Sequence, residues 1–368
     1  MVLKHLISAF ALASVLLSTA PLGSQPAPPT AARERTVPIY LSGSRALVML
    51  TLGERPPVPV VFDTGTEENL LQRTYVETMH FAPAGTTTIV DAANGSATPV
   101  PVVALPEARL GGVALNGLRA ASFPYREEDA IGVFGPNSFS GELVYLELGS
   151  GRLRLRPKSP SALPAGEATP YLEGLPATRI EVAGIAVSAH LDSGNDSALI
   201  LPRALLGRLA LRAPAAIVGR ARSASGEQDV YGARLRGDVR IGPVVLHDPN
   251  VTFADGPNAN VGLPVIRRLT ILLDPEGRRD WVLQPRAMSL AEMRAYVGRY
   301  GARAIRLEGR ALLYQRDGRS PQALAALGDD LFETPTTGDR LQFRRERGRI
   351  TGFDFIAAGG AVAAADRD

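Results

Sequence analysis

The chain of 368 residues contains no cysteine, which excludes disulfides, thiolate nucleophiles and cysteine-ligated zinc. Histidine is also scarce, and the four histidines stand too far apart for the ligand spacing of a zinc hydrolase: His5, His80, His190 and His247. The sequence therefore disfavours a zinc hydrolase.

Lysine is almost absent, and charge of either sign is not clustered. Lys4 and Lys158 are the only lysines, and the arginines that supply the other positive charges are scattered along the chain. The formal net charge is only +3, and no run of like charges forms a candidate binding patch. We therefore expect no nucleic-acid partner.

Long hydrophobic runs are absent after the first twenty residues. Near the start, Lys4 and His5 precede an apolar run at 6–17, and small residues follow up to Ala20. This order is typical of an export signal in residues 1–20, and the run is too short to span a bilayer comfortably. We expect a periplasmic or secreted protein. Because Pro21 would follow the cut, an uncleaved membrane tether stays an alternative.

Short apolar stretches separated by turn residues make up most of the remaining chain, in keeping with 37 glycines and 29 prolines. Residues 46–52, 58–62 and 142–148 are too short and too rich in β-branched residues for helices, so we expect strands. A Pro/Ala-rich spacer at 21–36 and a Pro-rich linker at 157–170 interrupt this pattern. The sequence predicts a mainly β protein.

An internal repeat on the two sides of the linker is the strongest signal. In each half an apolar run ends at an aspartate, a hydroxyl residue and a glycine, with an offset of 129 residues (192 − 63): Asp63-Thr64-Gly65 and Asp192-Ser193-Gly194. A turn-rich segment follows each triplet, and its glycines are Gly95 and Gly226; Asn94-Gly95 is a typical tight hairpin turn. An apolar-Gly segment comes next, in which Gly132 and Gly262 take matching places, 130 residues apart (262 − 132).

Two carboxylates that face each other share one proton, because both cannot be ionised a few ångströms apart. The ionised carboxylate can take a proton from water, while the protonated one donates to a substrate carbonyl as the tetrahedral intermediate forms. Thr64 and Ser193 offer hydroxyls that can lock the two loops together. Gly65 and Gly194 allow the backbone to come close to the carboxylates.

Both halves resemble the retropepsin-like and pepsin-like aspartyl proteases, and the chain is similar to bacterial exported members with two such halves in tandem. The resemblance covers roughly residues 37–285 and rests on the triplets, the turn segments and the apolar-Gly segments. It implies a bilobal, pseudo-symmetric pair of β-barrels in which Asp63 and Asp192 are the catalytic pair. It also implies that the two hairpins are flaps that bind substrate, through Asn94, Gly95, Ser225 and Gly226.

The second half departs from the family pattern at Asn195. This residue follows the second triplet, where the family more often has Ser, Thr or Ala, whereas Thr66 in the first half fits. Neither predicted flap tip carries the tyrosine of pepsin-like enzymes. The second half could therefore be kept for its structure and weakened in its chemistry.

The repeat and the linkers predict three structural units. We expect an N-terminal lobe at 37–156, a C-terminal lobe at 171–287 and an accessory β domain at 288–368. In "YVGRY" and "GRITGFDFI" the accessory domain resembles the small β domain appended to some bacterial exported serine hydrolases. That resemblance implies no catalytic residue.

These observations favour an exported aspartic-type endopeptidase, a hydrolase that binds a peptide or protein substrate in extended form between its lobes. We expect it to use no metal and no organic cofactor. Because both half-sites lie on one chain, a monomer suffices. Two alternatives stay open. One is a catalytically degenerate protease fold that binds peptides or proteins, and the other is a peptidase that assembles its site between chains.

His190 offers a rival to the carboxylate pair. It stands two residues before Asp192, so on a strand it shares the face of that carboxylate and could act as a general base. A partly buried strand histidine with one hydrogen bond is the better interpretation. A serine hydrolase is disfavoured because Ser193 lacks a Gly-x-Ser-x-Gly context.

Overall fold

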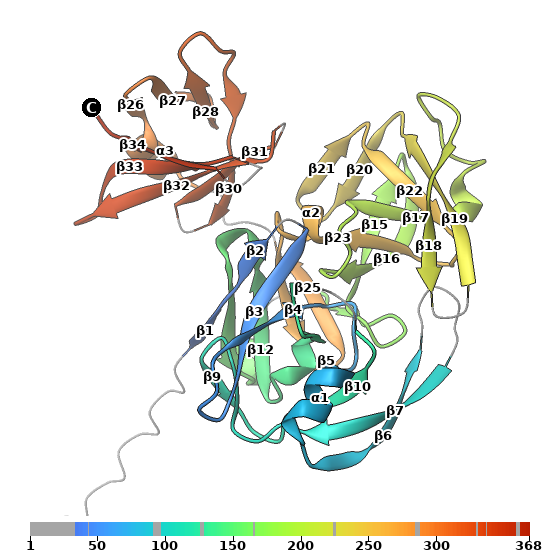
Figure 1. Ribbon diagram of the computed structural model, residues 1–368. Coiled ribbons are helices and arrows are strands. Elements are labelled where there is room, and N and C mark those ends of the chain that lie inside the picture. Colours follow the sequence, from blue (N-terminus) through green and yellow to red (C-terminus); the bar gives the residue numbers. More distant parts are fainter. Residues whose placement is uncertain are drawn as a thin grey trace, which may run out of the picture. The chain divides into compact units, whose positions relative to one another are not determined.

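The computed structural model describes residues 34–42, 44–90, 97–125, 129–164, 166–223, 226–283, 288–328, 330–335, 337–357 and 361–368. This part of the chain is mainly β, with short helices between strands, which confirms the predicted aspartic-protease-like β fold (Figure 1). The predicted signal and most of the spacer lie outside the described residues. In the described part, no helix has the length and apolarity needed to cross a membrane.

The first lobe is built on a ten-stranded sheet with the order β6-β7-β10-β5-β11-β4-β3-β8-β9, and β2 pairs with β3. Along β3 every second residue is buried, as a strand with one face on a core requires. Helix α1 (Arg73–Met79) and the short helix η1 (Pro136–Ser138) cross between strands. The strands are β2 (Tyr40–Ser42), β3 (Arg45–Leu52), β4 (Val58–Phe62), β5 (Leu70–Gln72), β6 (Pro83–Val90), β7 (Ala97–Ala104), β8 (Ala108–Leu110), β9 (Val113–Leu115), β10 (Arg119–Phe123) and β11 (Gly132–Phe134).

Apart from β2, the second lobe repeats this topology strand for strand, in the order β18-β19-β22-β17-β23-β16-β15-β20-β21. The short helix η4 (Arg203–Leu205) and α2 (Leu263–Ile266) take the places of α1 and η1. The strands are β15 (Ala177–Val182), β16 (Ile185–Asp192), β17 (Leu199–Pro202), β18 (Ala216–Ser223), β19 (Gly226–Arg234), β20 (Asp238–Ile241), β21 (Val244–His247), β22 (Asn250–Ala254) and β23 (Ala259–Gly262).

A six-stranded sheet joins the two halves, in the order β1-β13-β12-β24-β25-β14. Each half supplies three of these strands, and β12 of the first half pairs antiparallel with β24 of the second. The elements are β1 (Arg35–Pro38), β12 (Glu142–Glu147), β13 (Arg152–Pro157), β14 (Thr169–Pro170), β24 (Thr270–Asp274) and β25 (Arg279–Leu283), with the short helices η2 (Leu148–Ser150) and η3 (Pro160–Ala162). One continuous buried cluster of apolar side chains runs through both lobes and this sheet.

The strand register corrects one detail of the predicted repeat. In the second half Asp192 on β16 pairs with Gly262 on β23. In the first half Phe62 on β4 pairs with Phe134 on β11, so the residue beside Asp63 is the next one, Gly135. Gly262 therefore corresponds to Gly135 and not to Gly132, which the spacing had suggested.

Residues 288–368 form two small sheets with a core of their own, in which aromatic rings pack edge to face. Helix α3 (Leu290–Tyr296) begins at a capping box made by Ser289 and Glu292. The four-stranded sheet contains β26 (Gly298–Tyr300), β27 (Arg303–Glu308), β28 (Ala311–Arg316) and β29 (Gln322–Ala323). The five-stranded sheet contains β30 (Ala325–Gly328), β31 (Leu331–Thr334), β32 (Asp339–Glu346), β33 (Arg349–Ile356) and β34 (Val362–Asp366).

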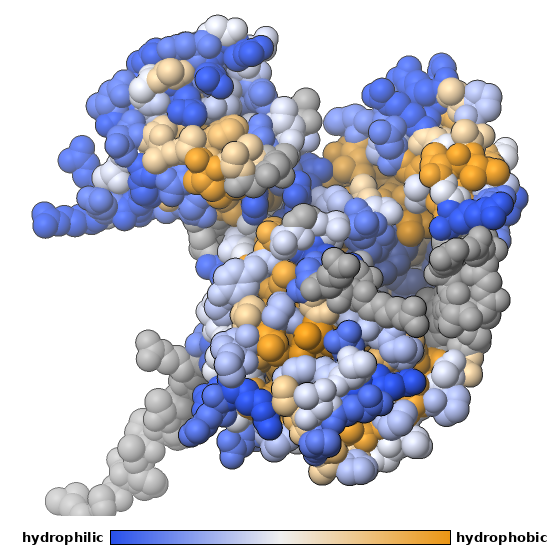
Figure 2. Space-filling model, viewed as in Figure 1, coloured by the Kyte–Doolittle hydropathy of each residue, from blue (hydrophilic) through white to orange (hydrophobic). Residues whose placement is uncertain are grey.

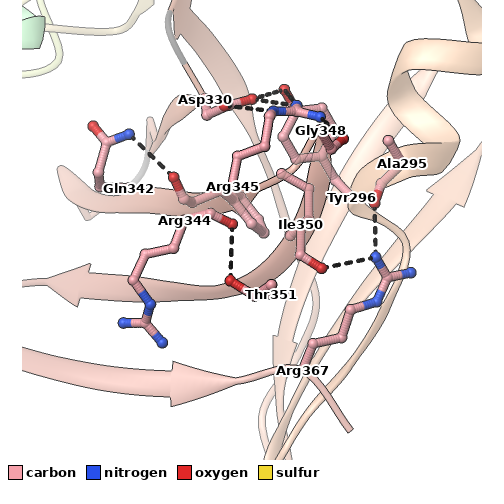
Figure 3. Close-up of polar contacts among 11 residues, drawn as sticks. Ala295, Tyr296, Asp330, Gln342, Arg344, Arg345, Gly348, Ile350, Thr351 and Arg367 are labelled. Carbon is pink, nitrogen blue, oxygen red and sulfur yellow. Dashed lines mark hydrogen bonds and ion pairs between the residues drawn. The ribbon is translucent and has the colours of Figure 1, made fainter.

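An ion pair beside α3 links β32 to the residue that precedes β31. The Arg345 guanidinium donates to both oxygens of Asp330, at 2.9 Å and 2.6 Å, and the Tyr296 hydroxyl donates to the same carboxylate (Figure 3). Burial and the neighbouring Asp330 raise the pKa of Tyr296 to about 12. The phenol therefore stays a hydrogen-bond donor throughout the physiological pH range.

Few large hydrophobic side chains are exposed in the described part of the chain. Two of them, Ile217 and Val218, are neighbours on β18, where a β-bulge interrupts the pairing with β19. Hydrophobic surface is visible in the right-hand part of Figure 2. The hairpin of the second lobe thus exposes apolar side chains instead of burying them.

Candidate active site

Each aspartate stands at the end of an inner strand of its lobe. Strand β4 lies between β3 and β11, and its last three residues are buried, so the chain leaves the core at Asp63. The backbone N–H of Asp63 donates to the Phe134 carbonyl at 3.0 Å. Asp192 is the last residue of β16, which lies between β15 and β23. An apolar run ends at an acid because the strand ends there, at the edge of the core.

The hydroxyl residues lock the two loops to each other, as the sequence predicted. Thr64 Oγ1 donates to the Leu191 carbonyl at 2.5 Å and accepts from the Ser193 N–H at 3.0 Å. In the reciprocal pair, Ser193 Oγ donates to the Phe62 carbonyl at 2.9 Å and accepts from the Thr64 N–H at 3.0 Å. Both side chains are fully buried. We call these four contacts the hydroxyl lock.

The lock brings the two carboxylates together. The Gly194 N–H lies 3.1 Å from Asp63 Oδ1 and 3.0 Å from Asp192 Oδ1, so one donor is shared by both acids. The Gly65 N–H donates to Asp63 Oδ1 at 2.7 Å. Hydrogen bonds from backbone N–H groups stabilise a charge that would otherwise be costly at a half-buried position.

Glycine is required at both loops because each loop touches the carboxylate of the other. A Cβ atom on Gly65 would lie 2.6 Å from Asp192 Oδ1, and a Cβ atom on Gly194 would lie 2.5 Å from Asp63 Oδ2. Real Cβ atoms do not approach other atoms this closely, so any side chain would push the two acids apart. Each triplet therefore needs glycine because the two loops lie so close together.

The pKa of Asp63 is raised well above its ordinary value. Burial is the main cause, and the negative charge of Asp192 adds to it. The N–H groups of Gly65 and Gly194 act in the opposite direction without cancelling the increase. The pair is thus arranged so that one carboxyl keeps a proton at a pH where a free carboxyl would have lost it.

Comparison with known families agrees with this geometry. Both halves match the aspartyl protease family. The matching segments are residues 48–137 and 178–265, and each contains one of the two aspartate triplets. No curated protein matches the chain. The family match thus covers the two lobes, and residues 288–368 lie outside it.

The half that contains Asp192 has two asparagines beside this carboxylate. Asn195 Nδ2 donates to Asn260 Oδ1 at 2.7 Å, and Asn260 Nδ2 donates to Asp192 Oδ2 at 2.7 Å. The sequence singled out Asn195 as a departure from the family pattern, but it gave no reason to select Asn260. The only available signal was a polar residue in "NANVG", at a position that is apolar in the first half.

Three of the four predicted flap residues, Asn94, Gly95 and Ser225, lie outside the described residues. Gly226 begins β19, whose backbone pairs with β18. The strands on both sides of each predicted turn are present as antiparallel hairpins, β6–β7 and β18–β19, on the right of Figure 1. A role for these residues as flaps stays a prediction.

His190 does not contact the carboxylates in the described structure. Its Nε2 lies 3.3 Å from Glu173 Oε2, and its buried Nδ1 has no partner among the described residues. This geometry agrees with a partly buried strand histidine and gives no support to a general base. In the described part of the chain, no group of three or more His, Asp or Glu side chains could hold a metal ion.

Proposed function

We propose that the protein is an aspartic-type endopeptidase in which Asp63 and Asp192 are the catalytic pair. The observation that carries the proposal is the single Gly194 N–H shared by the two carboxylates, at 3.1 Å and 3.0 Å. Two acids held this close titrate as a pair, and the raised pKa of Asp63 supports a shared proton.

Such a pair performs both halves of acid–base catalysis. The ionised carboxylate removes a proton from a water molecule, and the resulting hydroxide adds to the peptide carbonyl carbon. The protonated carboxyl gives its proton to the carbonyl oxygen, so the tetrahedral intermediate forms without a separated charge. Collapse of this intermediate transfers a proton to the amide nitrogen and breaks the C–N bond. The hydroxyl lock keeps the two acids at a fixed separation during these steps.

The substrate class follows from the fold and not from a single pocket. Both lobes carry an antiparallel hairpin, and an extended peptide can add to such strands through its main chain. The exposed pair Ile217 and Val218 supports a preference for apolar side chains in the bound segment. We therefore propose an extended peptide or an unfolded protein segment as the substrate.

Export and a monomeric state are parts of the same proposal. Residues 1–20 have the composition of an export signal, so we propose that the protein acts in the periplasm or outside the cell. The hydroxyl lock joins Thr64 to Ser193 of the same chain, which supports a site complete in one molecule. N-terminal sequencing of the exported protein and its mass in solution test both parts.

The test of activity is cleavage of a mixed peptide library by the purified protein across pH 3 to 8. Asp63→Asn and Asp192→Asn are each expected to lower the cleavage rate by a factor of at least about 10³, because each removes one of the two proton carriers. Asp196→Asn is the matched control, because Asp196 is an exposed aspartate in the same loop as Gly194. Its rate should stay within a factor of about two.

Two other results would lead to different functions. Cleavage that survives in Asp192→Asn would show that the second half is a scaffold, and the two-carboxylate mechanism would be wrong. Peptide binding without cleavage at any pH would make the protein a binding module with a protease fold. Inhibition by a statine-type peptide, which imitates the tetrahedral intermediate, separates the hydrolase from the binding module.

A further inference from the structure

The two carboxylates of the pair do not have the same surroundings. A chain of three hydrogen bonds reaches Asp192 from one side, and nothing comparable reaches Asp63 in the described part of the structure. The chain runs from the Ser197 N–H to Asn195 Oδ1 at 2.8 Å, from Asn195 Nδ2 to Asn260 Oδ1 at 2.7 Å, and from Asn260 Nδ2 to Asp192 Oδ2 at 2.7 Å.

The orientation of both amides is fixed by the first member of this chain. A backbone N–H can only donate, so Asn195 must turn its oxygen towards Ser197 and its NH₂ group towards Asn260. Asn260 must then present its oxygen to Asn195, which leaves its NH₂ group facing Asp192. The donor at Asp192 Oδ2 is therefore determined by the network and not by a free choice of amide rotamer.

Counting donors on each carboxylate shows the asymmetry. Asp192 Oδ1 accepts from the N–H groups of Gly194 and Asn195, and Oδ2 accepts from Asn260. On Asp63, the N–H groups of Gly65 and Gly194 both donate to Oδ1. Among the described residues, no N–H donor reaches Asp63 Oδ2. A carboxylate surrounded by donors favours the ionised form, and an oxygen without a donor is free to carry a proton.

Among its described residues, the first half has no counterpart of the asparagine chain. The strand register places Val133 where the second half has Asn260, and Val61 where it has His190. Val61 and Val133 are buried together in an apolar cluster. In the part of the chain that the structure describes, this polar network therefore belongs to the second half alone.

We propose that Asn260, oriented by Asn195, is a positioning residue that makes Asp192 the ionised member of the pair and leaves the shared proton on Asp63 Oδ2. Its role in catalysis rests on the proposed endopeptidase function, whereas the charge assignment does not. Asp192 would then take the proton from water, and Asp63 would protonate the carbonyl oxygen. The burial that raises the pKa of Asp63 acts in the same direction.

The other groups that titrate near this network are few. Asp63 faces Asp192 from the loop after β4, and His190 precedes it on β16, with Glu173 against the His190 ring. Asp196 follows on the loop and is exposed. His190, Glu173 and Asp196 are kept in all the variants below.

The test is the pH profile of kcat/KM for wild type and for Asn260→Leu, which removes the amide at similar volume. The acid limb reports formation of the single negative charge, and the alkaline limb reports loss of the second proton. We expect the acid limb to move up by about one pH unit, since one hydrogen bond to an ionised group is lost. The alkaline limb should stay in place, because Asp192 is charged on both sides of that step.

Two further variants separate positioning from packing. Val133→Leu changes bulk at the matching place of the first half and should move neither limb. Asn195→Ala should move the acid limb up by less than Asn260→Leu does, and it should have no further effect when Asn260 is already Leu. An alkaline limb that moves while the acid limb stays would place the charge on Asp63 and overturn the proposal.

A second readout keeps the inference testable without enzymatic activity. Titration of ¹³C-labelled aspartate carboxyls by NMR, with Asp63→Asn and Asp192→Asn used for assignment, shows which carboxyl ionises first. We expect Asp192 to ionise first in the wild type, and its step to move up in Asn260→Leu. If Asp63 ionises first, the proposal is wrong even when peptides are cleaved. If no peptide is cleaved but Asp192 ionises first, only the proposed function fails.

Discussion

Replacing Thr64 by valine tests the hydroxyl lock directly, because valine keeps the shape of the side chain and removes its oxygen. The Leu191 carbonyl and the Ser193 N–H would both lose their partner in a fully buried environment. Each buried group left without a partner costs about 1–3 kcal/mol, so the loss of two partners should lower the free energy of unfolding by about 2–6 kcal/mol. Trp281, the single tryptophan, lies on β25 of the six-stranded sheet that joins the two halves. Its fluorescence during unfolding in urea therefore reports the stability of the two lobes.

A control and a second variant sharpen this experiment. Thr178→Val changes another buried threonine, on β15 of the second lobe, and should cost less than about 1 kcal/mol. Ser193→Ala breaks the same lock from the other side, so the double variant should cost clearly less than the sum of the two single changes. A loss below about 0.5 kcal/mol for Thr64→Val, or full additivity, would show that the lock does not hold the loops together.

Three other changes have defined outcomes. Burial raises the pKa of Asp280 to about 7, above the unfolded value of 3.8, so its contribution to stability is complete below pH 4 and is lost as the pH rises through 7. Asp280→Asn should abolish this pH-dependent destabilisation, which amounts to up to about 4 kcal/mol in the wild type. Equal melting curves for both proteins from pH 5 to 9 would contradict this prediction. The raised pKa of Asp63 has the same sign, so Asp63→Asn should raise the melting temperature at pH 8 and leave it nearly unchanged at pH 3. Arg345→Met removes both guanidinium hydrogen bonds to Asp330 and should destabilise residues 288–368 by about 1–3 kcal/mol. This destabilisation should be seen as loss of near-UV circular dichroism without a change in Trp281 fluorescence. A matching change in fluorescence would mean that residues 288–368 do not unfold separately.

The sequence predicted the parts of the fold that depend on local pattern. The apolar runs at 46–52 and 58–62 predicted most of β3 and all of β4, because they are too short and too rich in β-branched residues for helices. The repeated triplet predicted that Asp63 and Asp192 belong to one site. Neither pattern contains the choice of partner strand, so the pairing of β12 with β24 across the two halves was not foreseen.

The apolar-Gly segments show why a matching spacing can mislead. Gly132 and Gly262 each follow an apolar residue, but the strand pairing places Gly135 beside the first aspartate. Glycine is needed at both matching positions because another part of the chain lies too close for a side chain. A Cβ atom on Gly135 would lie 2.9 Å from the Thr66 carbonyl oxygen, and a Cβ atom on Gly262 would lie 1.9 Å from the Ser197 carbonyl oxygen. Such distances depend on tertiary packing and are not visible in a list of residues.

Asn260 was missed for a related reason. An asparagine between Ala259 and Val261 is ordinary in a strand that nears its end, and its value depends on a carboxylate 68 residues earlier in the chain. The neighbouring Asn195 could be noticed because it broke a family pattern. The role of such a polar residue depends on the groups around it in the folded structure, which the sequence alone does not show.

Because the two halves are linked in one chain, they can differ in sequence, which the two identical chains of a symmetric dimer cannot. In a symmetric dimer both half-sites are encoded by the same codons, so a change at one position is made twice, and the two acids start from equal surroundings. Here the linked halves are encoded separately, and one has Val133 where the other has Asn260. Different residues at matching positions of the two halves can therefore determine which carboxylate is ionised before a substrate binds.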